Sequence, residues 1–187
     1  MKTQMMKTKL LLVIIALFSL GAKSQNINFP DANFKAALLG TNFNNYVICY
    51  DHNNTNFLLD QNQDGEIQMS EASLVKRMVF FQRSNYTTLE GINSFVNLET
   101  ILYENDGSSS HIHGKIDDIN IDGLNNFKTF NLSGCDIGKI SIKNCPNLIE
   151  IKSAYTDTYN ASNFNVHGNT QEMTIDNCAI TKNSMDQ

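Results

Sequence analysis

The chain has 187 residues and a formal net charge of −5 at pH 7, with its 14 Lys and Arg residues scattered along its length. Because these basic residues form no stripe, the composition argues against nucleic acid and anionic membrane surfaces as partners. The four cysteines include no Cys-x-x-Cys pair, so the spacing signatures of a zinc site and of a thioredoxin-like redox motif are missing.

The first 24 residues have the anatomy of a secretory signal peptide. Lys2, Lys7 and Lys9 make the positive start, an apolar stretch runs from Leu10 to Leu20, and Ala22-Lys23-Ser24 offers a small-x-small cleavage site. The apolar stretch is short for a membrane span, although an uncleaved anchor is an alternative. We therefore expect a protein that is secreted or exposed on the cell surface, without membrane contact after cleavage. About 160 residues then remain, enough for one domain with a core.

The segment from Pro30 to Leu39 is predicted to form a short amphipathic helix. Pro and Asp near its start suit a helix N-terminus, and Gly40 suits the stop. Phe34, Ala37 and Leu38 share one face. Because the polar face is not basic, we expect this helix to pack on the repeats that follow it, and a role at a membrane surface is disfavoured.

The stretch from Asp60 to Glu71 is a twelve-residue acidic loop with the spacing of an EF-hand calcium site. The EF-hand loop supplies oxygen ligands from positions 1, 3, 5, 7, 9 and 12, with Gly at position 6 for the sharp turn. Gly65 occupies the turn position, and Ile67 is the apolar residue that ties the loop to a core. The sequence therefore predicts Ca²⁺ as the cofactor. The predicted ligands are Asp60, Asn62, Asp64, the backbone carbonyl of Glu66, Gln68 directly or through water, and Glu71 with both carboxylate oxygens.

A single loop of this type favours a structural calcium site over a sensing one. Sensor EF-hands come in pairs and expose a Met-rich groove, whereas the sequence contains one such loop. The residues before it, 53–59, lack the features of an entering helix, and the segment from Glu71 to Lys76 is predicted as an exiting helix. A regulatory calcium site and a solvated acidic loop are the alternatives.

A repeating apolar pattern occupies most of the remaining chain. The segment from Phe127 to Ile137 fits L-x-x-L-x-L-x-x-(N/C)-x-L with apolar substitutes at the Leu positions. The pattern recurs about every 22 residues, with one longer step at the loop-like insertion 105–114. Such segments stack as parallel strands around a continuous interior, and the recurring Asn or Cys is expected at a turn, where its side chain satisfies backbone groups. An antiparallel sandwich is the alternative, but its strands would not keep a common period.

Two series of apolar residues follow from this period. The first, predicted to stack as one inward column, is Val79, Ile101, Phe130, Ile151 and Met173, and the second, about halfway between its members, is Ile119, Ile140 and Phe164. The full set of side chains predicted to point inward is Val79, Phe81, Ile101, Tyr103, Ile119, Ile121, Phe130, Leu132, Ile140, Ile142, Leu148, Ile151, Phe164, Met173 and Ile175.

Together these motifs resemble exported bacterial leucine-rich-repeat proteins. Such proteins carry an I-x-x-P-D-A-N-F-K-A-A-L-L helix, a D-x-N-x-D-G-E-I-x-x-S-E-A loop and an L-x-G-I entry into the first full repeat. Ile27 to Leu39, Asp60 to Ala72 and Leu89 to Ile92 match these motifs in turn. The connection from Gly40 to Phe57 is longer than the resemblance implies, and the repeats are irregular.

The resulting expectation is an α+β fold, a short leucine-rich-repeat solenoid of parallel β-strands with a small helical N-terminal cap that contains the EF-hand-like loop. The predicted divisions are a signal peptide at 1–24, the cap at 25–77 and the solenoid at 78–187. In that register Cys135, Cys145 and Cys178 are expected to be mainly reduced, buried turn residues.

The expected function is that of a non-enzymatic recognition module for a protein or glycan whose identity the sequence leaves open. Tyr86, Tyr155 and Tyr159 are candidate contacts because aromatic residues are enriched at binding hot spots. The rival hypothesis is a calcium-dependent hydrolase or an accessory domain of one. Its expected signature is a pocket of convergent titratable groups around His111, His113 and Asp117.

Overall fold

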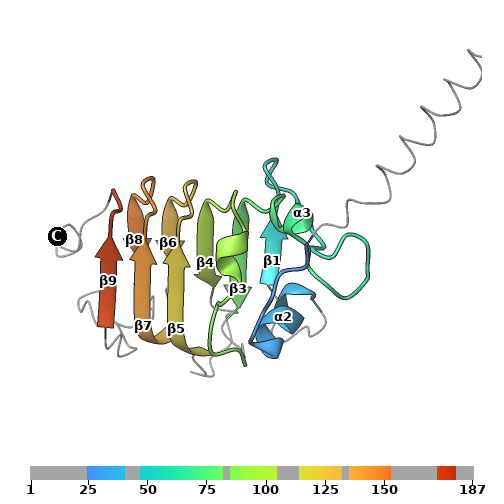
Figure 1. Cartoon of the computed structure of the whole chain (residues 1–187), viewed down its shortest axis with the longest axis horizontal. Helices are drawn as coiled ribbons and strands as arrows, with labels where there is room; N and C mark the ends of the chain where they lie inside the picture. Colours follow the sequence, from blue (N-terminus) through green and yellow to red (C-terminus); the bar gives the residue numbers. More distant parts are fainter. Residues whose placement is uncertain are drawn as a thin grey trace, which may run out of the picture.

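The computed structural model describes residues 25–40, 47–81, 85–104, 114–131, 135–152 and 172–179. Within these residues the fold is mixed α/β, with two β-sheets, two short α-helices and one 3₁₀ turn (Figure 1). The larger sheet has the strand order β2-β1-β3-β4-β6-β8, and the smaller has the order β5-β7-β9. The larger sheet comprises β1 (Val47–Tyr50), β2 (Asn56–Phe57), β3 (Arg77–Phe81), β4 (Thr100–Glu104), β6 (Thr129–Asn131) and β8 (Glu150–Lys152). The smaller comprises β5 (Gly114–Asp122), β7 (Cys135–Lys143) and β9 (Glu172–Asp176).

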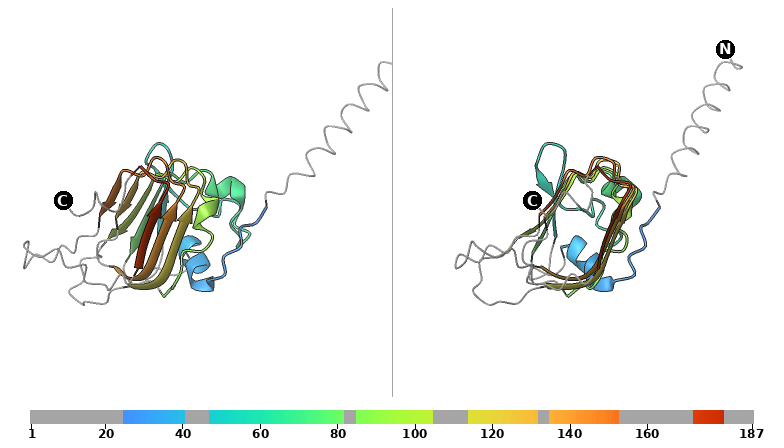
Figure 2. Two further views of the ribbon diagram at one scale, coloured as in Figure 1. Left: turned by 60° about the vertical axis from the view of Figure 1, so that its left-hand side comes forward. Right: turned by 90° about the vertical axis from the view of Figure 1, so that its left-hand side faces the viewer.

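The two sheets face each other across one apolar core (Figure 2). In β5 the buried residues are Ile116, Ile119 and Ile121, and their partners in β7 are isoleucines as well. β-branched side chains fit the pleated surface of a strand, and burial of one such side chain stabilises the fold by about 1.5–3 kcal/mol. The same core contains Phe127, Phe130 and other residues that the larger sheet and its connections contribute.

The larger sheet changes strand direction at β3. Strands β2, β1 and β3 pair antiparallel, whereas β3, β4, β6 and β8 pair parallel. The residues Val47-Ile48-Cys49-Tyr50 of β1 therefore extend the parallel strands with an antiparallel ribbon. From the sequence, this stretch is expected to belong to the long connection from Gly40 to Phe57.

The helix α2 (Ala32–Leu38) begins at Asp31, whose carboxylate accepts the backbone N–H groups of Asn33 and Phe34 at 2.9 and 3.2 Å. Such an N-cap satisfies donors that have no partner within the helix. The buried face of α2 comprises Phe34, Ala37 and Leu38, as predicted. The second helix, α3 (Met69–Ala72), contains the last residues of the acidic loop and is shorter than the predicted exiting helix. Among the described residues, no helix is long and apolar enough to cross a membrane.

Phe34 joins α2 to an aromatic cluster. Its ring stacks on Phe80 of β3 with centroids 6.3 Å apart and lies 5.3 Å from Tyr86. Phe80 in turn stacks on Tyr103 of β4 at 4.9 Å. Gly91 (φ 103°) starts the 3₁₀ turn Ile92–Ser94 against Phe29, where a Cβ atom would lie 2.6 Å from the Phe29 ring. Glycine at this point of the L-x-G-I motif is therefore a steric requirement.

The prediction of a leucine-rich-repeat solenoid with a helical N-terminal cap is wrong. The structure has two sheets of different size, one of which is mixed. The described residues before β3 contribute antiparallel strands and two short helices that form no helical cap. The physical reason is that the apolar period predicts which strands pair in parallel, but it does not predict what pairs with the outer edge of the first of these strands, β3. An antiparallel ribbon pairs the free edge of β3 as well as a further repeat would.

The predicted inward column also needs correction. The register of the larger sheet aligns Met78, Ile101, Phe130 and Ile151, so Met78 takes the place predicted for Val79. β3 has three consecutive buried residues, so its sequence does not alternate and the apolar pattern fits two registers. Met173 pairs with Ile140 in the smaller sheet and belongs to the second series.

Most of the predicted core residues that the structure describes are buried. Ile101, Tyr103, Ile119, Ile121, Phe130, Ile140, Ile142 and Leu148 belong to the core cluster, and Ile151 packs against it partly buried. Phe81 and Ile175 are only partly buried, and Phe80 takes the inward position predicted for Phe81. Leu132, Phe164 and the side chain of Met173 lie outside the described residues.

Asparagine side chains connect successive turns at both ends of the strands. Before β4, β6 and β8, the side-chain amides of Asn97, Asn126 and Asn147 donate to backbone carbonyls of the preceding turn at 2.7, 3.1 and 2.6 Å. After β7 and β9, Asn144 and Asn177 adopt φ 51°, and the Asn177 amide donates to the Asn144 side chain at 2.8 Å. Asn97, Asn126 and Asn147 precede the strands and are not the recurring Asn or Cys of the predicted pattern. Of the residues at that position, Cys145 and Cys178 lie at the turns after β7 and β9 and bond backbone carbonyls there, as predicted.

Candidate calcium site

The acidic loop begins after β2 and runs into α3, and its second half is fixed to the rest of the fold. Ile67 is fully buried, and its carbonyl accepts the backbone N–H of Ile27 at 2.8 Å. Met69 donates its backbone N–H to Gln25 at 3.0 Å, so the chain segment before α2 runs alongside the end of the loop. Burial of Ile67 therefore anchors the loop to the core, as the motif predicts for position 8.

The first half of the loop is folded by its own acidic and amide side chains. The carboxylate of Asp60 accepts the backbone N–H groups of Asp64 at 3.2 Å and Gly65 at 2.9 Å. Asn62 accepts the N–H of Asp64 at 3.0 Å, and Asp64 accepts the N–H of Glu66 at 2.9 Å. Each oxygen that accepts one N–H keeps a second lone pair. The loop is thus held with oxygen atoms of positions 1, 3 and 5 in a fixed local arrangement.

The backbone of this half requires left-handed conformations. Gly65 has φ 79°, and Gln63 has φ 58°. Glycine adopts such a value without a steric cost, whereas a residue with a Cβ does so at a cost. Gly65 is therefore explained by the turn that follows Asp64, and Gln63 is the strained position of the loop.

The side chains of Asn62, Asp64 and Gln68 converge. The Gln68 amide donates to both Asp64 carboxylate oxygens at 3.2 and 3.0 Å, and the Asn62 amide donates to Asp64 at 3.0 Å and to Gln68 at 3.3 Å. An amide that turns by 180° exchanges its nitrogen for its oxygen. A turned Gln68 amide can therefore present its oxygen to a cation beside the Asp64 carboxylate, whereas Asn62 keeps its oxygen on the Asp64 N–H.

Glu71 closes the loop from α3. It is 5 % exposed, and its two carboxylate oxygens accept the backbone N–H groups of Gln61 at 2.7 Å and Gln68 at 2.9 Å. A buried carboxylate is costly unless it is hydrogen-bonded, and here one carboxylate ties both ends of the loop together. This is the position from which the motif predicts a bidentate ligand.

The side chain of Glu66 is paired with α2. Its carboxylate forms an ion pair with Lys35 of α2 at 2.6 Å. The motif assigns only its backbone carbonyl to the cation, so this arrangement agrees with the predicted role. Hydrogen bonds from Glu66 N–H, Gln68 and Asn62, with the nearby Lys35 charge, lower the pKa of Asp64 although partial desolvation opposes them. Asp64 is therefore a carboxylate at neutral pH.

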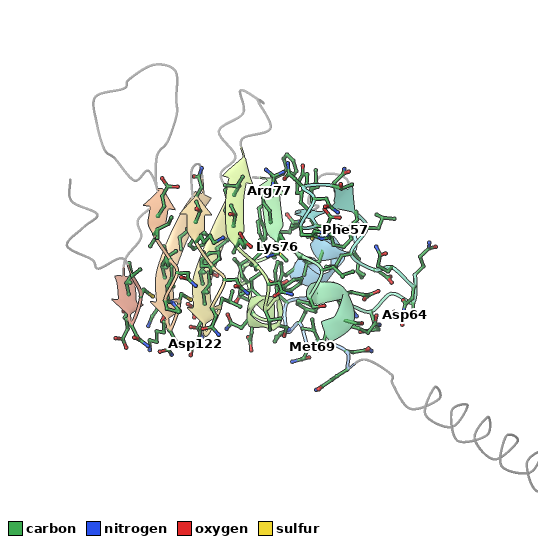
Figure 3. The ribbon with its side chains drawn as sticks, turned by 90° about the horizontal axis from the view of Figure 1, so that it is seen from above. Phe57, Asp64, Met69, Lys76, Arg77 and Asp122 are labelled. Carbon is green, nitrogen blue, oxygen red and sulfur yellow. The ribbon has the colours of Figure 1, made fainter. Side chains whose placement is uncertain are left out.

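Figure 3 shows Asp64 at the outer margin of the molecule, with Asp122 far from it on β5. Among the described residues, no three His, Cys, Asp or Glu side chains gather into a metal-binding group. The side chains that do converge are one carboxylate and two amides. A calcium site built here would therefore draw on amide and backbone oxygens as well as on Asp60, Asp64 and Glu71. These are the hard donors that calcium takes.

Sequence reasoning missed a surface pocket beside the loop. It has a volume of about 520 Å³, and Gln61, the second residue of the loop, lies in its wall. The lining combines apolar Phe57 and Leu74 with Lys76, which pairs with Glu99. Phe57 and Lys76 are labelled in Figure 3. These residues are too far apart in sequence for spacing to indicate the pocket. Its full lining is Asp51, His52, Phe57, Gln61, Ser73, Leu74, Lys76 and Asn97.

The other predicted functional residues do not assemble into a second site within the described residues. Tyr86, predicted as an exposed contact, is 1 % exposed and packs against Phe34 and Phe80, so that prediction is wrong. Tyr155, Tyr159, His111 and His113 lie outside the described residues, as does the predicted signal peptide at 1–24.

Asp117 and Asp118 both face solvent, although neighbours in a regular strand point to opposite faces. Their backbone N–H groups both point to the carbonyl of Thr87, at 2.8 and 3.4 Å. The adjacent strand carries Gly138 at this point, where a Cβ atom would lie 2.6 Å from the Asp117 carbonyl oxygen. The regular alternation is interrupted here, which explains why both carboxylates are outside.

No known protein family, curated protein or solved structure matches the chain. The case for function therefore rests on the residues of the loop and the pocket.

Proposed function

We propose that the chain is a calcium-binding protein in which Ca²⁺ occupies the loop from Asp60 to Glu71. The observation that carries this proposal is the hydrogen-bond arrangement of the loop. Asp60, Asn62 and Asp64 each accept loop N–H groups, while Glu71 spans both ends. Four carboxylates in twelve residues repel one another, and a divalent cation would relieve that repulsion.

In this proposal the role of calcium is structural. Buried Ile67 fixes the second half of the loop to the core, and Glu71 joins that half to Gln61, so cation binding would stabilise the folded arrangement without opening a groove. A ligand that binds only the folded state adds RT ln(1 + [L]/Kd) to stability. With a Kd of roughly 10⁻⁴ to 10⁻³ M, millimolar calcium adds about 0.4 to 1.4 kcal/mol.

Calorimetric titration and thermal melting with calcium or chelator test this proposal. We expect binding at one site and a modest rise in melting temperature. Asp60→Asn and Glu71→Gln keep the shape of the side chains but remove the charge, so both should lose the calcium heat. Asp117→Ala and Asp118→Ala, which change carboxylates outside the loop, should retain it. Absence of calcium heat in the unaltered protein at millimolar concentration would overturn the proposal.

We further propose that the protein is exported and that it serves recognition of a protein or glycan. The pocket beside the loop supports this, because it combines the Phe57 ring and Leu74 with polar groups from Asp51, His52 and Asn97. Binding pockets typically have volumes of about 300–1,000 Å³ and a few polar groups that orient the ligand. Gln61 connects the pocket to the calcium loop, since its backbone N–H binds Glu71 and its side chain lines the pocket.

A pull-down from the secreted proteins and glycans of the source, with calcium or chelator present, tests recognition. Leu74→Asp changes a half-exposed pocket residue and should abolish capture of a specific partner. Val96→Asp places the same charge at a half-exposed position outside the pocket lining and should leave capture unchanged. Equal capture by both variants would exclude the pocket as the recognition site.

A further inference from the structure

The turns after β7 and β9 each carry a cysteine at the same position. Cys145 follows Asn144 and Cys178 follows Asn177, and both asparagines have φ 51°. Each thiol donates a hydrogen bond to the backbone carbonyl two residues earlier, at 3.2 Å for Cys145 and 3.3 Å for Cys178. The two turns therefore have the same local conformation.

The sheet places these two turns side by side. β7 and β9 pair parallel and in register up to their last residues. The register continues beyond them, because Asn144 donates its backbone N–H to Asp176 at 3.1 Å and accepts the Asn177 amide at 2.8 Å. Equivalent residues of neighbouring strands are about 4.8 Å apart. That places Cys145 and Cys178 within the Cα separation of about 4.4–6.8 Å that disulfides have.

The two thiols also interact. The Cys178 sulfur lies 3.8 Å from the carbonyl oxygen of Ile142, so it is directed toward β7. Burial first, and the adjacent Cys178 side chain in addition, raise the pKa of the Cys145 thiol to about 11. Cys145 is buried, whereas Cys178 is partly exposed. A reagent in solution therefore reaches Cys178 first.

We propose that Cys145 and Cys178 form an intrachain disulfide when the folded protein meets a small-molecule disulfide such as oxidised glutathione. The Cys178 thiolate attacks one sulfur of the oxidant, which forms a mixed disulfide and releases one molecule of reduced thiol. The Cys145 thiolate then attacks the Cys178 sulfur and releases the second. In total, two protein thiols lose two protons and two electrons, and one oxidant disulfide becomes two thiols.

This cross-link would join the end of β9, an outer strand of the smaller sheet, to the end of β7. It would close the chain from Cys145 to Cys178 into a loop, and loop closure restricts the unfolded state more than the folded one. The inference is independent of the calcium proposal. Cys145 is buried as the sequence predicts, whereas the expectation of burial is wrong for Cys178, which is partly exposed.

Peptide mapping of the folded full-length chain, after incubation with oxidised glutathione and alkylation of remaining thiols, tests the proposal. We expect a peptide pair that joins Cys145 to Cys178, two hydrogen masses lighter than the separate peptides. We also expect the melting temperature to rise by several degrees and to return to its initial value with reductant. Cys178→Ser should leave Cys145 alkylatable only after unfolding. Cys49→Ser, which changes a fully buried thiol of β1, should leave the cross-link intact.

Three results would overturn the proposal. The first is a stable glutathione adduct on Cys178 with Cys145 still reduced, which would show that the thiols cannot reach each other. The second is a cross-link from either residue to Cys135. The third is that both cysteines of the folded protein are still fully alkylated after prolonged oxidation, at a pH where the unfolded chain does form the mixed disulfide with glutathione.

Discussion

The acidic turns before β3 and the asparagine turns from β3 onward are held by side-chain hydrogen bonds of different sequence range. In the first region, Asp51, Asp60 and Asp64 bind backbone N–H groups two to five residues away. In the second, the side chains of Asn126 and Asn144 reach partners 30 and 22 residues away. The first region is thus shaped by short polar motifs, and the second by a repeated period that aligns equivalent turns.

This difference teaches where a substitution should act. A change in the acidic loop removes bonds within the loop, whereas a change in an asparagine ladder removes a bond between turns that the sheet has brought together. The aromatic cluster of Phe34, Phe80 and Tyr103 joins the two regions, since its rings come from α2, β3 and β4. We therefore expect the residues before β3 and those from β3 onward to unfold in one transition, because this aromatic cluster packs the two regions together.

Phe80→Ala is expected to have the largest effect. Phe80 is fully buried and contacts aromatic rings from both regions. Its truncation should lower the free energy of unfolding by about 3–5 kcal/mol. Denaturant unfolding followed by far-UV circular dichroism measures this loss. Val96→Ala, at a half-exposed position, is the control and should change stability by less than about 0.5 kcal/mol. Two separate transitions in the unaltered protein would contradict joint unfolding.

Asn144→Ala is expected to have the next largest effect. It removes the 2.8 Å bond from the Asn144 amide to Asp122 and places a Cβ-bearing residue without a polar group at φ 51°. We expect a loss of about 2 kcal/mol, roughly half from hydrogen bonds and half from the backbone. Asn144→Gly keeps the backbone freedom and should recover about 1 kcal/mol of it. Equal stability of the two variants would show that the backbone conformation contributes nothing.

The same division explains how far the sequence predicts the fold. The sequence predicts Gly65 at the turn and Ile67 in the core, as observed, because a motif of fixed spacing encodes both residues. The parallel pairing of the strands at Ile101, Phe130 and Ile151 follows from the apolar period. These elements are predictable because a short motif or a regular spacing in the sequence determines them.

The missed features depend on contacts that neither a motif nor a period encodes. The antiparallel pairing of Val47 to Tyr50 with β3 replaces the predicted helical cap, and no interval links these strands. The predicted register of β3 is wrong by one residue. Met78, Val79 and Phe80 are all buried, so buried and exposed residues do not alternate and the sequence does not define the register. The pocket beside the loop depends on segments that only the folded chain brings together.

Asp31 links the two regions through one carboxylate, and its replacement should cost about 1 kcal/mol. One oxygen caps α2, and the other accepts the backbone N–H of Thr87 at 2.7 Å. Asp31→Asn can keep the helix cap but presents an N–H₂ group to the Thr87 N–H, so it should lose the second bond. Asp31→Ala should lose both contributions. Thermal melting at pH 7 distinguishes the two variants, and identical values would show that the Thr87 bond is without effect.

The pH dependence sharpens this test. Partial burial would raise the pKa of Asp31, but the N–H groups of Thr87, Phe34 and Asn33 outweigh it and lower the pKa below the ordinary value of 3.8. The stabilisation is therefore complete above the unfolded-state pKa and is lost as the pH falls through the lower folded-state value. Melting curves from pH 5 to pH 2 should show a smaller decline for Asp31→Asn than for the unaltered protein. A parallel decline would contradict the role of the charge.

Lys35→Gln should have the smallest effect on stability and a measurable effect on the proposed calcium site. The Lys35–Glu66 pair is partly exposed, so its loss should cost at most about 1 kcal/mol. The Lys35 charge also acts on Asp64, a predicted ligand. Removal of a positive charge near a divalent cation strengthens cation binding, and in a solvent-screened setting we expect calcium affinity to rise about two- to threefold. Calorimetric titration measures this change.

Lys128→Gln, which removes an exposed lysine paired with Glu99, should leave the affinity unchanged. Weaker binding in Lys35→Gln would instead show that Lys35 holds Glu66 in the position from which its backbone carbonyl serves the ion.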